Sequence, residues 1–217
     1  MRLQLAIDTL GLAEAEALVS RVRELVDLVE VGTPLVIREG VRAVRRLHAA
    51  FPELAILADL KIADGGHLEA TLGFEAGARV VTVLAAAADA TVREVVRAAR
   101  ERGGEVMVDL LGVEDLARRA REVDALGVDY VCLHTAVDVQ GAHPDLAGAT
   151  LEGLARLKAA LRSARTAVAG GITLERCAAV AALEPDVVVV GSAITSAADP
   201  RAAAAAMRAA LAAGGRR

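Results

Sequence analysis

Short runs of hydrophobic residues recur along the chain and alternate with longer segments in which apolar residues follow a helical period. The short runs have the length of buried strands, and their Val, Ile and Leu residues are continuous instead of alternating with polar ones. We expect strands at residues 3–8, 28–31, 55–61, 80–84, 105–110, 130–134, 166–169 and 187–190. The intervening pattern predicts helices at residues 12–25, 35–50, 67–76, 91–102, 114–126, 151–161, 174–183 and 200–213.

Helix-ending residues support this alternation. They lie where the predicted helices must stop, at Pro52, Gly77, Gly103, Gly104, Gly127 and Pro185. Continuous apolar strands separated by helices are typical of a parallel sheet covered on both faces. Eight such units predict one α/β domain, a single (β/α)8 TIM barrel over residues 1–213 with a frayed tail at 214–217. An open doubly wound sheet is the structural alternative.

Composition narrows the classes of function. The 217 residues carry 25 Lys and Arg against 29 Asp and Glu, a net charge of −4, and include one Tyr, two Phe and no Trp. This balance argues against a nucleic-acid binder, which needs a cationic surface and stacking aromatics. No apolar run is long enough to span a membrane, and the first residues fit a strand better than a signal peptide. Cys132 and Cys177 fit packing residues in a reduced, cytoplasmic protein.

Charged residues gather where the predicted strands end. They come from five strands and comprise Asp8, Glu30, Asp59, Lys61, Asp109 and His134. In a closed parallel barrel the carboxyl ends of the strands form one face, and that face carries the chemistry. A single charge there is readily explained as a solvated strand end, but the set indicates an active site.

The densest signal is the segment 58–64, ADLKIAD, in which Asp59, Lys61 and Asp64 form a D-x-K-x-x-D arrangement. Side chains two apart in a strand share a face, so Asp59 and Lys61 are expected together inside the barrel. The two residues form either a structural ion pair or part of an active site. In an active site, the Asp59 carboxylate would hold the charged lysine or bind a metal beside it. Glu30 on the neighbouring strand can approach Asp59, and two such carboxylates suit Mg²⁺, although a shared proton or a salt bridge to Lys61 is the alternative.

Glycines follow the last two predicted strands. Gly170 and Gly171 follow the seventh strand, while Gly191 and Ser192 follow the eighth. These two loops commonly bind phosphate in such barrels, because glycine lets backbone amides approach the ligand. Tight turns alone would explain either cluster but not the position of both.

The histidines divide into one candidate and three surface residues. His134 ends a strand and opens the stretch HTAVDVQ, which makes it the candidate for proton transfer. We interpret His48, His67 and His143 as surface residues in helices or loops.

Segments along essentially the whole chain resemble the 3-hexulose-6-phosphate synthase family. They are LQLAIDTL (3–10), VEVGTPLVIREG (29–40), ADLKIADGG (58–66), VTVLAAAADAT (81–91), EVMVDLLG (105–112), HTAVDVQ (134–140), VAGGIT (168–173) and VVGSAIT (189–195). That family belongs with 3-keto-L-gulonate-6-phosphate decarboxylase in the orotidine 5′-monophosphate decarboxylase superfamily of barrels. The D-x-K-x-x-D motif in its strand context is specific for this superfamily.

The resemblance implies an aldehyde-lyase, which adds formaldehyde reversibly to D-ribulose 5-phosphate through an enediolate. It implies Mg²⁺, with Mn²⁺ possible, bound by Glu30 and Asp59. The other implied roles are contact with the substrate or with metal-bound groups for Asp8 and Asp109, enediolate stabilisation for Lys61, and proton transfer for His134. Phosphate binding is implied for Gly170, Gly171, Gly191 and Ser192. Asp64 matches a residue that reaches across a homodimer interface into the partner's site.

The decarboxylase of the same group is the main alternative. We expect it to carry a Glu at the end of the fifth strand, an Arg shortly after the strand-six His and an Arg after the glycine that follows strand eight. This chain has Asp109, Val137 and Ser192 there, which favours the synthase. Orotidine 5′-monophosphate decarboxylase itself is disfavoured because Leu57 stands at its first lysine position.

A non-catalytic barrel that binds a sugar phosphate is the remaining alternative. Such a protein is expected to have lost Glu30, Asp59 or Lys61. All three are present, which favours an enzyme.

Overall fold

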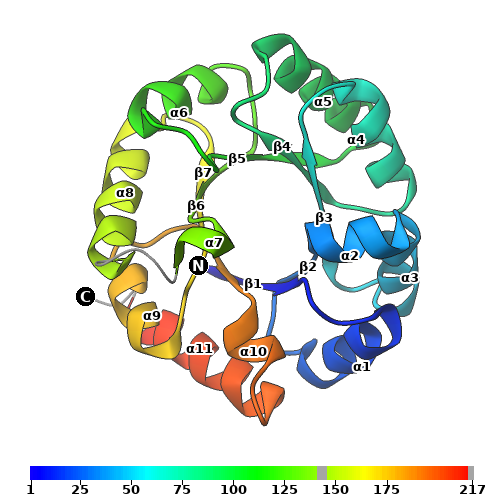
Figure 1. Ribbon diagram of the computed structural model, residues 1–217, viewed down its shortest axis with the longest axis vertical. Helices are drawn as coiled ribbons and strands as arrows, with labels where there is room; N and C mark the ends of the chain where they lie inside the picture. The colour runs from blue at the N-terminus through cyan, green and yellow to red at the C-terminus, as the bar shows by residue number, and fades with distance from the viewer. Residues whose placement is uncertain (141–145, 215–217) are drawn as a thin grey trace.

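The computed structural model is a closed barrel of parallel strands surrounded by helices (Figure 1). The structure describes residues 1–140 and 146–214. Each strand pairs with the next, and β8 returns to β1, which confirms the single (β/α)8 barrel. The strands are β1 (Arg2–Ile7), β2 (Leu28–Val31), β3 (Ala55–Ile62), β4 (Val80–Leu84), β5 (Glu105–Asp109), β6 (Tyr130–His134), β7 (Arg165–Ala169) and β8 (Val187–Val190).

The helices form the outer ring in Figure 1. They are α1 (Leu12–Val22), α2 (Thr33–Glu39), α3 (Arg42–Ala50), α4 (Gly66–Glu75), α5 (Asp89–Arg102), α6 (Leu116–Asp124), α7 (Val137–Gln140), α8 (Leu146–Ala160), α9 (Leu174–Ala181), α10 (Ser192–Thr195) and α11 (Pro200–Gly214). None of the helices in the described part of the chain is long and apolar enough to cross a membrane.

The structure changes several of the helix predictions. The predicted helix 35–50 is two helices, α2 and α3, because the chain turns at Gly40, whose φ of 63° and ψ of −171° end the first one. The short helices α7 and α10 were not expected, and α8 starts before the predicted residue 151. Helix α11 includes Gly214, so the predicted tail begins one residue too early. Residues 215–217 and His143 lie outside the described residues.

Two apolar layers hold the barrel together. The larger lies between the outer face of the sheet and the helices, where many of the helix residues that contact the sheet are Ala or Val. The smaller fills the barrel interior and contains Leu28, Leu57, Val80, Met107 and Val187. Since side chains alternate along a strand, the interior positions before and after this layer fall at the two ends of the barrel, where polar residues occupy them.

Candidate active site

A cavity of about 540 Å³ opens at the carboxyl end of the barrel. Every predicted site residue except Asp64 lines it: Asp8, Glu30, Asp59, Lys61, Asp109, His134, Gly170, Gly171, Gly191 and Ser192. The fold therefore brings together charged residues that are far apart in the sequence, since Asp8 and His134 are separated by 126 positions. Convergence of this kind is the expected arrangement for an active site on a parallel barrel.

An irregularity at the end of β3 sets the position of Lys61. The pairing of β3 with β4 shifts register between Ala58 and Ile62, and Lys61 has a left-handed backbone with φ of 46°. Its backbone N–H donates to Thr82 Oγ1 over 2.9 Å. A bulge of this type re-aims a side chain, and here it places Lys61 Nζ 2.6 Å from Asp59 Oδ2.

Asp59 is held by hydroxyl groups on both sides. Thr82 Oγ1 donates to Asp59 Oδ1 over 2.8 Å, and Thr33 Oγ1 donates to Asp59 Oδ2 over 2.7 Å. The residue is 5% exposed, and hydrogen bonds of this kind offset the cost of burying its carboxylate. Asp59 thus has a fixed orientation before any ligand arrives.

Lys61 is a fixed cation at the centre of the site. Burial by itself would lower the pKa of Lys61, but the hydrogen-bonded Asp59 carboxylate and the nearby Asp109 raise it above its ordinary value. Nζ lies 3.4 Å from Asp109 Oδ2. The ammonium group is therefore fully charged at neutral pH and can stabilise negative charge that develops on a ligand oxygen.

Asp109 and His134 form a second pair. His134 Nδ1 lies 2.8 Å from Asp109 Oδ2, and the Leu111 N–H donates to Asp109 Oδ1 over 2.9 Å. Burial works to raise the pKa of Asp109, but His134 and then Lys61 outweigh it and lower that pKa below its usual range. Because Nδ1 is engaged by the carboxylate, Nε2 is the ring nitrogen that can exchange a proton with a ligand.

Glu30 and Asp8 add negative charge beside Asp59. Burial and the neighbouring Asp59 raise the pKa of Glu30 well above its ordinary value, and the same two causes raise the pKa of Asp8. Gln4 Nε2 donates to Glu30 Oε2 over 2.5 Å. A methyl group at Gly32 would collide with the Asp8 carboxylate, so that glycine leaves the space that Asp8 occupies.

The donor set fits a divalent cation with few protein ligands. No group of three or more His, Cys, Asp or Glu side chains in the described residues is arranged as a complete metal cage. Mg²⁺ is usually bound through one or two carboxylates and completes its shell with water and substrate oxygens. Glu30 and Asp59, two carboxylates whose mutual repulsion a cation would relieve, match that pattern.

The glycine loops line the wall of the cavity next to β7 and β8. Gly170 has a φ of 97°, and a methyl group there would collide with the backbone oxygen of Thr135. Gly171 has a φ of 66°. Gly191 precedes α10, which begins at Ser192. The glycines therefore fit the close approach of backbone that phosphate binding needs.

Asp64 lies outside this cavity. It is exposed in the loop after β3, and its Oδ1 accepts a hydrogen bond from the Gly65 N–H over 2.8 Å. Within one chain it does not join the other site residues in lining the cavity.

Several residues of the site were not found from the sequence. Gln4, Thr33 and Thr82 line the cavity. Gln4 donates a hydrogen bond to Glu30, and the two threonines donate hydrogen bonds to Asp59. Gln4 and Thr82 were detectable as polar residues inside otherwise apolar strands. Thr33 carries no such signal.

The cysteines and the other histidines were predicted to be packing or surface residues and not catalytic ones. Cys132 lines the cavity floor, but burial raises the pKa of its thiol well above the ordinary value, so it is a packing residue; Cys177 is also buried. His48 is exposed, as predicted. His67 is half-buried and pairs with Glu101 over 2.8 Å on the outer helices.

Comparison with known proteins identifies the family. The sequence model of the orotidine 5′-phosphate decarboxylase / HUMPS family matches residues 1–207. The chain belongs to this family. Among its family relatives, "3-hexulose-6-phosphate synthase" of Bacillus subtilis is 46% identical over 92% of this chain and 93% of its own length. "3-hexulose-6-phosphate synthase 3" of Staphylococcus saprophyticus is 44% identical over 97% of this chain and 99% of its own.

Solved structures of the family match the barrel closely. 3-Hexulose-6-phosphate synthase from Salmonella typhimurium superposes with a TM-score of 0.92 at 43% identity, covering 99% of this chain and all of that one. The 3-keto-L-gulonate-6-phosphate decarboxylase from Vibrio cholerae superposes with a TM-score of 0.82 at 29% identity, covering 98% of this chain and 97% of that one. Both share the barrel, but the synthase is much more similar in sequence.

Proposed function

We propose that this protein is a 3-hexulose-6-phosphate synthase, an aldehyde-lyase that adds formaldehyde to D-ribulose 5-phosphate and forms D-arabino-hex-3-ulose 6-phosphate reversibly. The observation that carries this proposal is the identity of 44–46% to proteins of that name over nearly their full length. The decarboxylase structures reach only 25–29%. Asp109, Val137 and Ser192 stand where we expect Glu, Arg and Arg in the decarboxylase, which favours the synthase.

The site supplies what carbon–carbon bond formation beside a ketone needs. A proton leaves the carbon next to the ketone of ribulose 5-phosphate, the resulting enediolate carbon attacks formaldehyde, and the new alkoxide takes up a proton. His134, oriented by Asp109, carries the proton through Nε2. The Lys61 ammonium, held by Asp59, stabilises the enediolate oxygen.

Mg²⁺, with Mn²⁺ as an alternative, is part of the proposal. Glu30 and Asp59 would hold it, and when bound it would supply a Lewis acid for the substrate oxygens. In this proposal Asp8, which lines the same cavity as Glu30, would contact the substrate or the water around the ion.

The loops with Gly170, Gly171, Gly191 and Ser192 hold the phosphate in this proposal. They lie on the opposite side of the cavity from β3, so the phosphate of a five-carbon sugar would place its other end near Lys61. Formaldehyde is small and uncharged and needs only the remaining space.

The proposed enzyme is a homodimer in which Asp64 enters the partner's site. In support, Asp64 is exposed and lies apart from the site of its own chain. Helix α4, which follows it, exposes two large apolar residues, Leu68 and Leu72, 66% and 48% exposed. Exposed apolar side chains beside a functional residue are typical of an interface. The buried free cysteines agree with a reducing compartment, and we propose the cytoplasm.

A direct assay tests the proposal. Wild-type protein with Mg²⁺, ribulose 5-phosphate and formaldehyde is expected to consume formaldehyde, and chelation with EDTA is expected to stop it. Asp59→Asn should lose at least about a thousandfold in kcat/KM, because it removes a cation ligand and the partner of Lys61. Glu152→Gln, an exposed change on α8, is the matched control and should leave the rate unchanged.

Two results would contradict the proposed function. No formaldehyde consumption, together with release of CO₂ from 3-keto-L-gulonate 6-phosphate, would replace the synthase with the decarboxylase. Full activity of Asp59→Asn would refute the metal assignment.

A further inference from the structure

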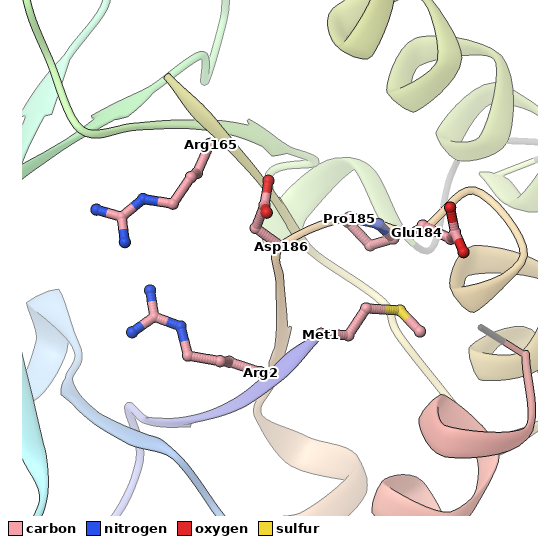
Figure 2. A pocket seen from close by; sticks show the side chains of 6 residues that line it. All are labelled: Met1, Arg2, Arg165, Glu184, Pro185 and Asp186. Atoms are coloured by element: carbon pink, nitrogen blue, oxygen red, sulfur yellow. The ribbon is translucent and has the colours of Figure 1, made fainter. Parts of the chain in front are cut away.

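The amino-terminal end of the barrel carries a second polar cavity that the proposed reaction does not use. It has a volume of about 340 Å³ and is lined by Met1, Arg2, Arg165, Glu184, Pro185 and Asp186 (Figure 2). The apolar interior layer, with Leu28, Leu57 and Val187, lies between it and the cavity at the carboxyl end. The two cavities share no lining residue.

Two arginines frame this cavity and share an aromatic ring. The guanidinium carbon of Arg165 lies 3.8 Å from the centre of the Tyr130 ring, and that of Arg2 lies 5.2 Å from it. Arg2 also donates a hydrogen bond to the Tyr130 hydroxyl. Figure 2 shows the two guanidinium groups facing one another, while the Glu184 carboxylate lies away from them.

In the described part of the chain, the two arginines at Tyr130 have one carboxylate paired with them, that of Glu105. Arg165 and Arg79 both pair with one carboxylate, Glu105, and Arg2 forms no ion pair within the described residues. Burial works to raise the pKa of Glu105, but Arg165 and then Arg79 and Arg2 bring it below the ordinary value. Two guanidinium groups thus pair with a single carboxylate, and the charge of a third acts on it from nearby.

Of the other acids near the cavity, Asp186 and Asp129 are engaged, and Glu184 is exposed with its carboxylate directed away from the two arginines. Asp186 accepts hydrogen bonds from the Thr166 N–H over 2.7 Å and from Thr166 Oγ1 over 3.1 Å. Asp129 pairs with Arg100 over 3.1 Å. The arginines that face the opening therefore retain donor capacity that Glu105 alone does not use.

We propose that this cavity binds a phosphate-type oxyanion between Arg2 and Arg165. A guanidinium group offers a planar fork of N–H donors that matches the oxygens of a phosphate, and two facing forks can bind it from both sides. The group would belong either to inorganic phosphate or to a phosphate monoester, since the cavity has room for both. Binding there is independent of the proposed synthase reaction and would stabilise the folded barrel.

Tyr130 makes this site directly observable. It is the single Tyr of a chain without Trp, so intrinsic fluorescence excited near the tyrosine absorption band reports on the ring that touches both arginines. Titration of the wild-type protein with inorganic phosphate should give a saturable change in fluorescence and a higher Tm. Sodium chloride at the same ionic strength should not, and an equal response to chloride would reduce the effect to screening and overturn the proposal.

Variants separate this site from the proposed active site. Ser192→Asp places a carboxylate in the phosphate loop at the carboxyl end and should leave the fluorescence titration intact. Arg2→Gln and Arg165→Gln should each weaken phosphate binding at least about tenfold in that background. Arg121→Gln, an exposed arginine of α6 without an ion pair in the described residues, is the matched control.

Parallel titrations identify the source of the phosphate group. A response to inorganic phosphate shows that the group alone suffices, and a response to ribulose 5-phosphate but not to phosphate assigns a monoester. A titration that survives Arg165→Gln, or that disappears in Ser192→Asp, would overturn the proposal. Formaldehyde consumption by the wild-type enzyme is measured separately, so failure of this site leaves the synthase proposal standing.

Discussion

Gln4 has a polar side chain in the buried strand β1, and only one end of its amide group forms a hydrogen bond. It is 1% exposed, its Nε2 donates to Glu30, and its Oε1 has no hydrogen-bond partner in the described structure. A buried amide with an unpaired oxygen is costly, and such groups gather where function requires them. We infer that Gln4 is a positioning residue that orients the Glu30 carboxylate toward the cavity.

Replacing this amide tests that role. Gln4→Leu keeps the side chain's bulk but removes the N–H that orients Glu30, so kcat/KM for formaldehyde addition should fall about 10- to 100-fold. The concentration of Mg²⁺ that gives half-maximal activity should rise, and binding of Mn²⁺ followed by electron paramagnetic resonance should weaken in parallel. An unchanged Mn²⁺ affinity would assign Gln4 a purely structural role.

His134 is the residue whose proposed role concerns the proton alone. In D₂O without formaldehyde, the wild-type enzyme should exchange the proton beside the ketone of ribulose 5-phosphate, as followed by NMR. His134→Gln keeps a polar group but cannot carry the proton, and exchange should slow by about 100-fold or more. His48→Gln, on the exposed face of α3, should exchange at the wild-type rate. Wild-type exchange by His134→Gln would move the proton transfer to another group.

Residues at strand ends were predictable, whereas their hydrogen-bond partners were not. Asp59 and Lys61 stand out because they interrupt an apolar run. Thr33 follows β2 and Thr82 lies in β4, and the pairing of these strands with β3 brings both hydroxyls to one carboxylate. The sequence pattern marks Thr82 as a polar residue in an apolar strand, but it does not show which side chain Thr82 or Thr33 bonds to.

At the scale of elements, the contact between Asp59 and Lys61 at the end of β3 was predicted correctly, but strand alternation alone does not explain it. Simple alternation places Asp59 and Lys61 on one face, and they do meet. In the structure, a register shift between β3 and β4 and the left-handed backbone of Lys61 bring the two side chains together. A regular alternating strand has neither feature. Helices α7 and α10 escaped prediction for a related reason, since four residues are too few to display a helical period.

The break between α2 and α3 depends on one backbone conformation. Gly40 has φ of 63° and ψ of −171°, a region essentially reserved for glycine, and a methyl group there would meet nothing within 4 Å. Gly40→Ala should therefore lower the free energy of unfolding by about 1–3 kcal/mol through backbone strain alone. Urea denaturation measures this change.

Gly103 is the matched control for Gly40. It ends α5 with φ of 66° and ψ of 24°, in the left-handed region that asparagine tolerates, and it also has open space around it. Gly103→Asn should cost less than about 1 kcal/mol. Equal losses for Gly40→Ala and Gly103→Asn would mean that the helix break does not require the special conformation of Gly40.

At the scale of the whole molecule, the barrel is a tube with an apolar middle and two polar ends. Strand periodicity was enough to predict the closed sheet, because eight buried parallel strands have few other ways to cover their edges. The ten predicted site residues other than Asp64 line one cavity. Asp64 lies outside this cavity, and within one chain nothing in the strand pattern could assign its position a role, which is why the proposal of a shared site needs a separate test.

Subunit complementation tests the placement of Asp64. Asp59→Asn and Asp64→Asn are each expected to be inactive as pure proteins. In a hybrid dimer, the Asp64→Asn chain keeps Glu30, Asp59 and Lys61, while the Asp59→Asn chain supplies its own Asp64 to that site. One of the two sites is then complete. Random mixing makes half of the dimers hybrid, so coexpression in equal amounts should restore about one quarter of the wild-type rate.

Differently tagged chains allow the hybrid to be purified, and it should show about half of the wild-type rate per dimer because one of its two sites is intact. An inactive hybrid would place Asp64 in the site of its own chain or show that both sites must be intact together. A fully active pure Asp64→Asn protein would remove this residue from the chemistry. A monomeric wild-type protein with full activity would refute the shared site, because the exposed Asp64 would then have no second chain to enter.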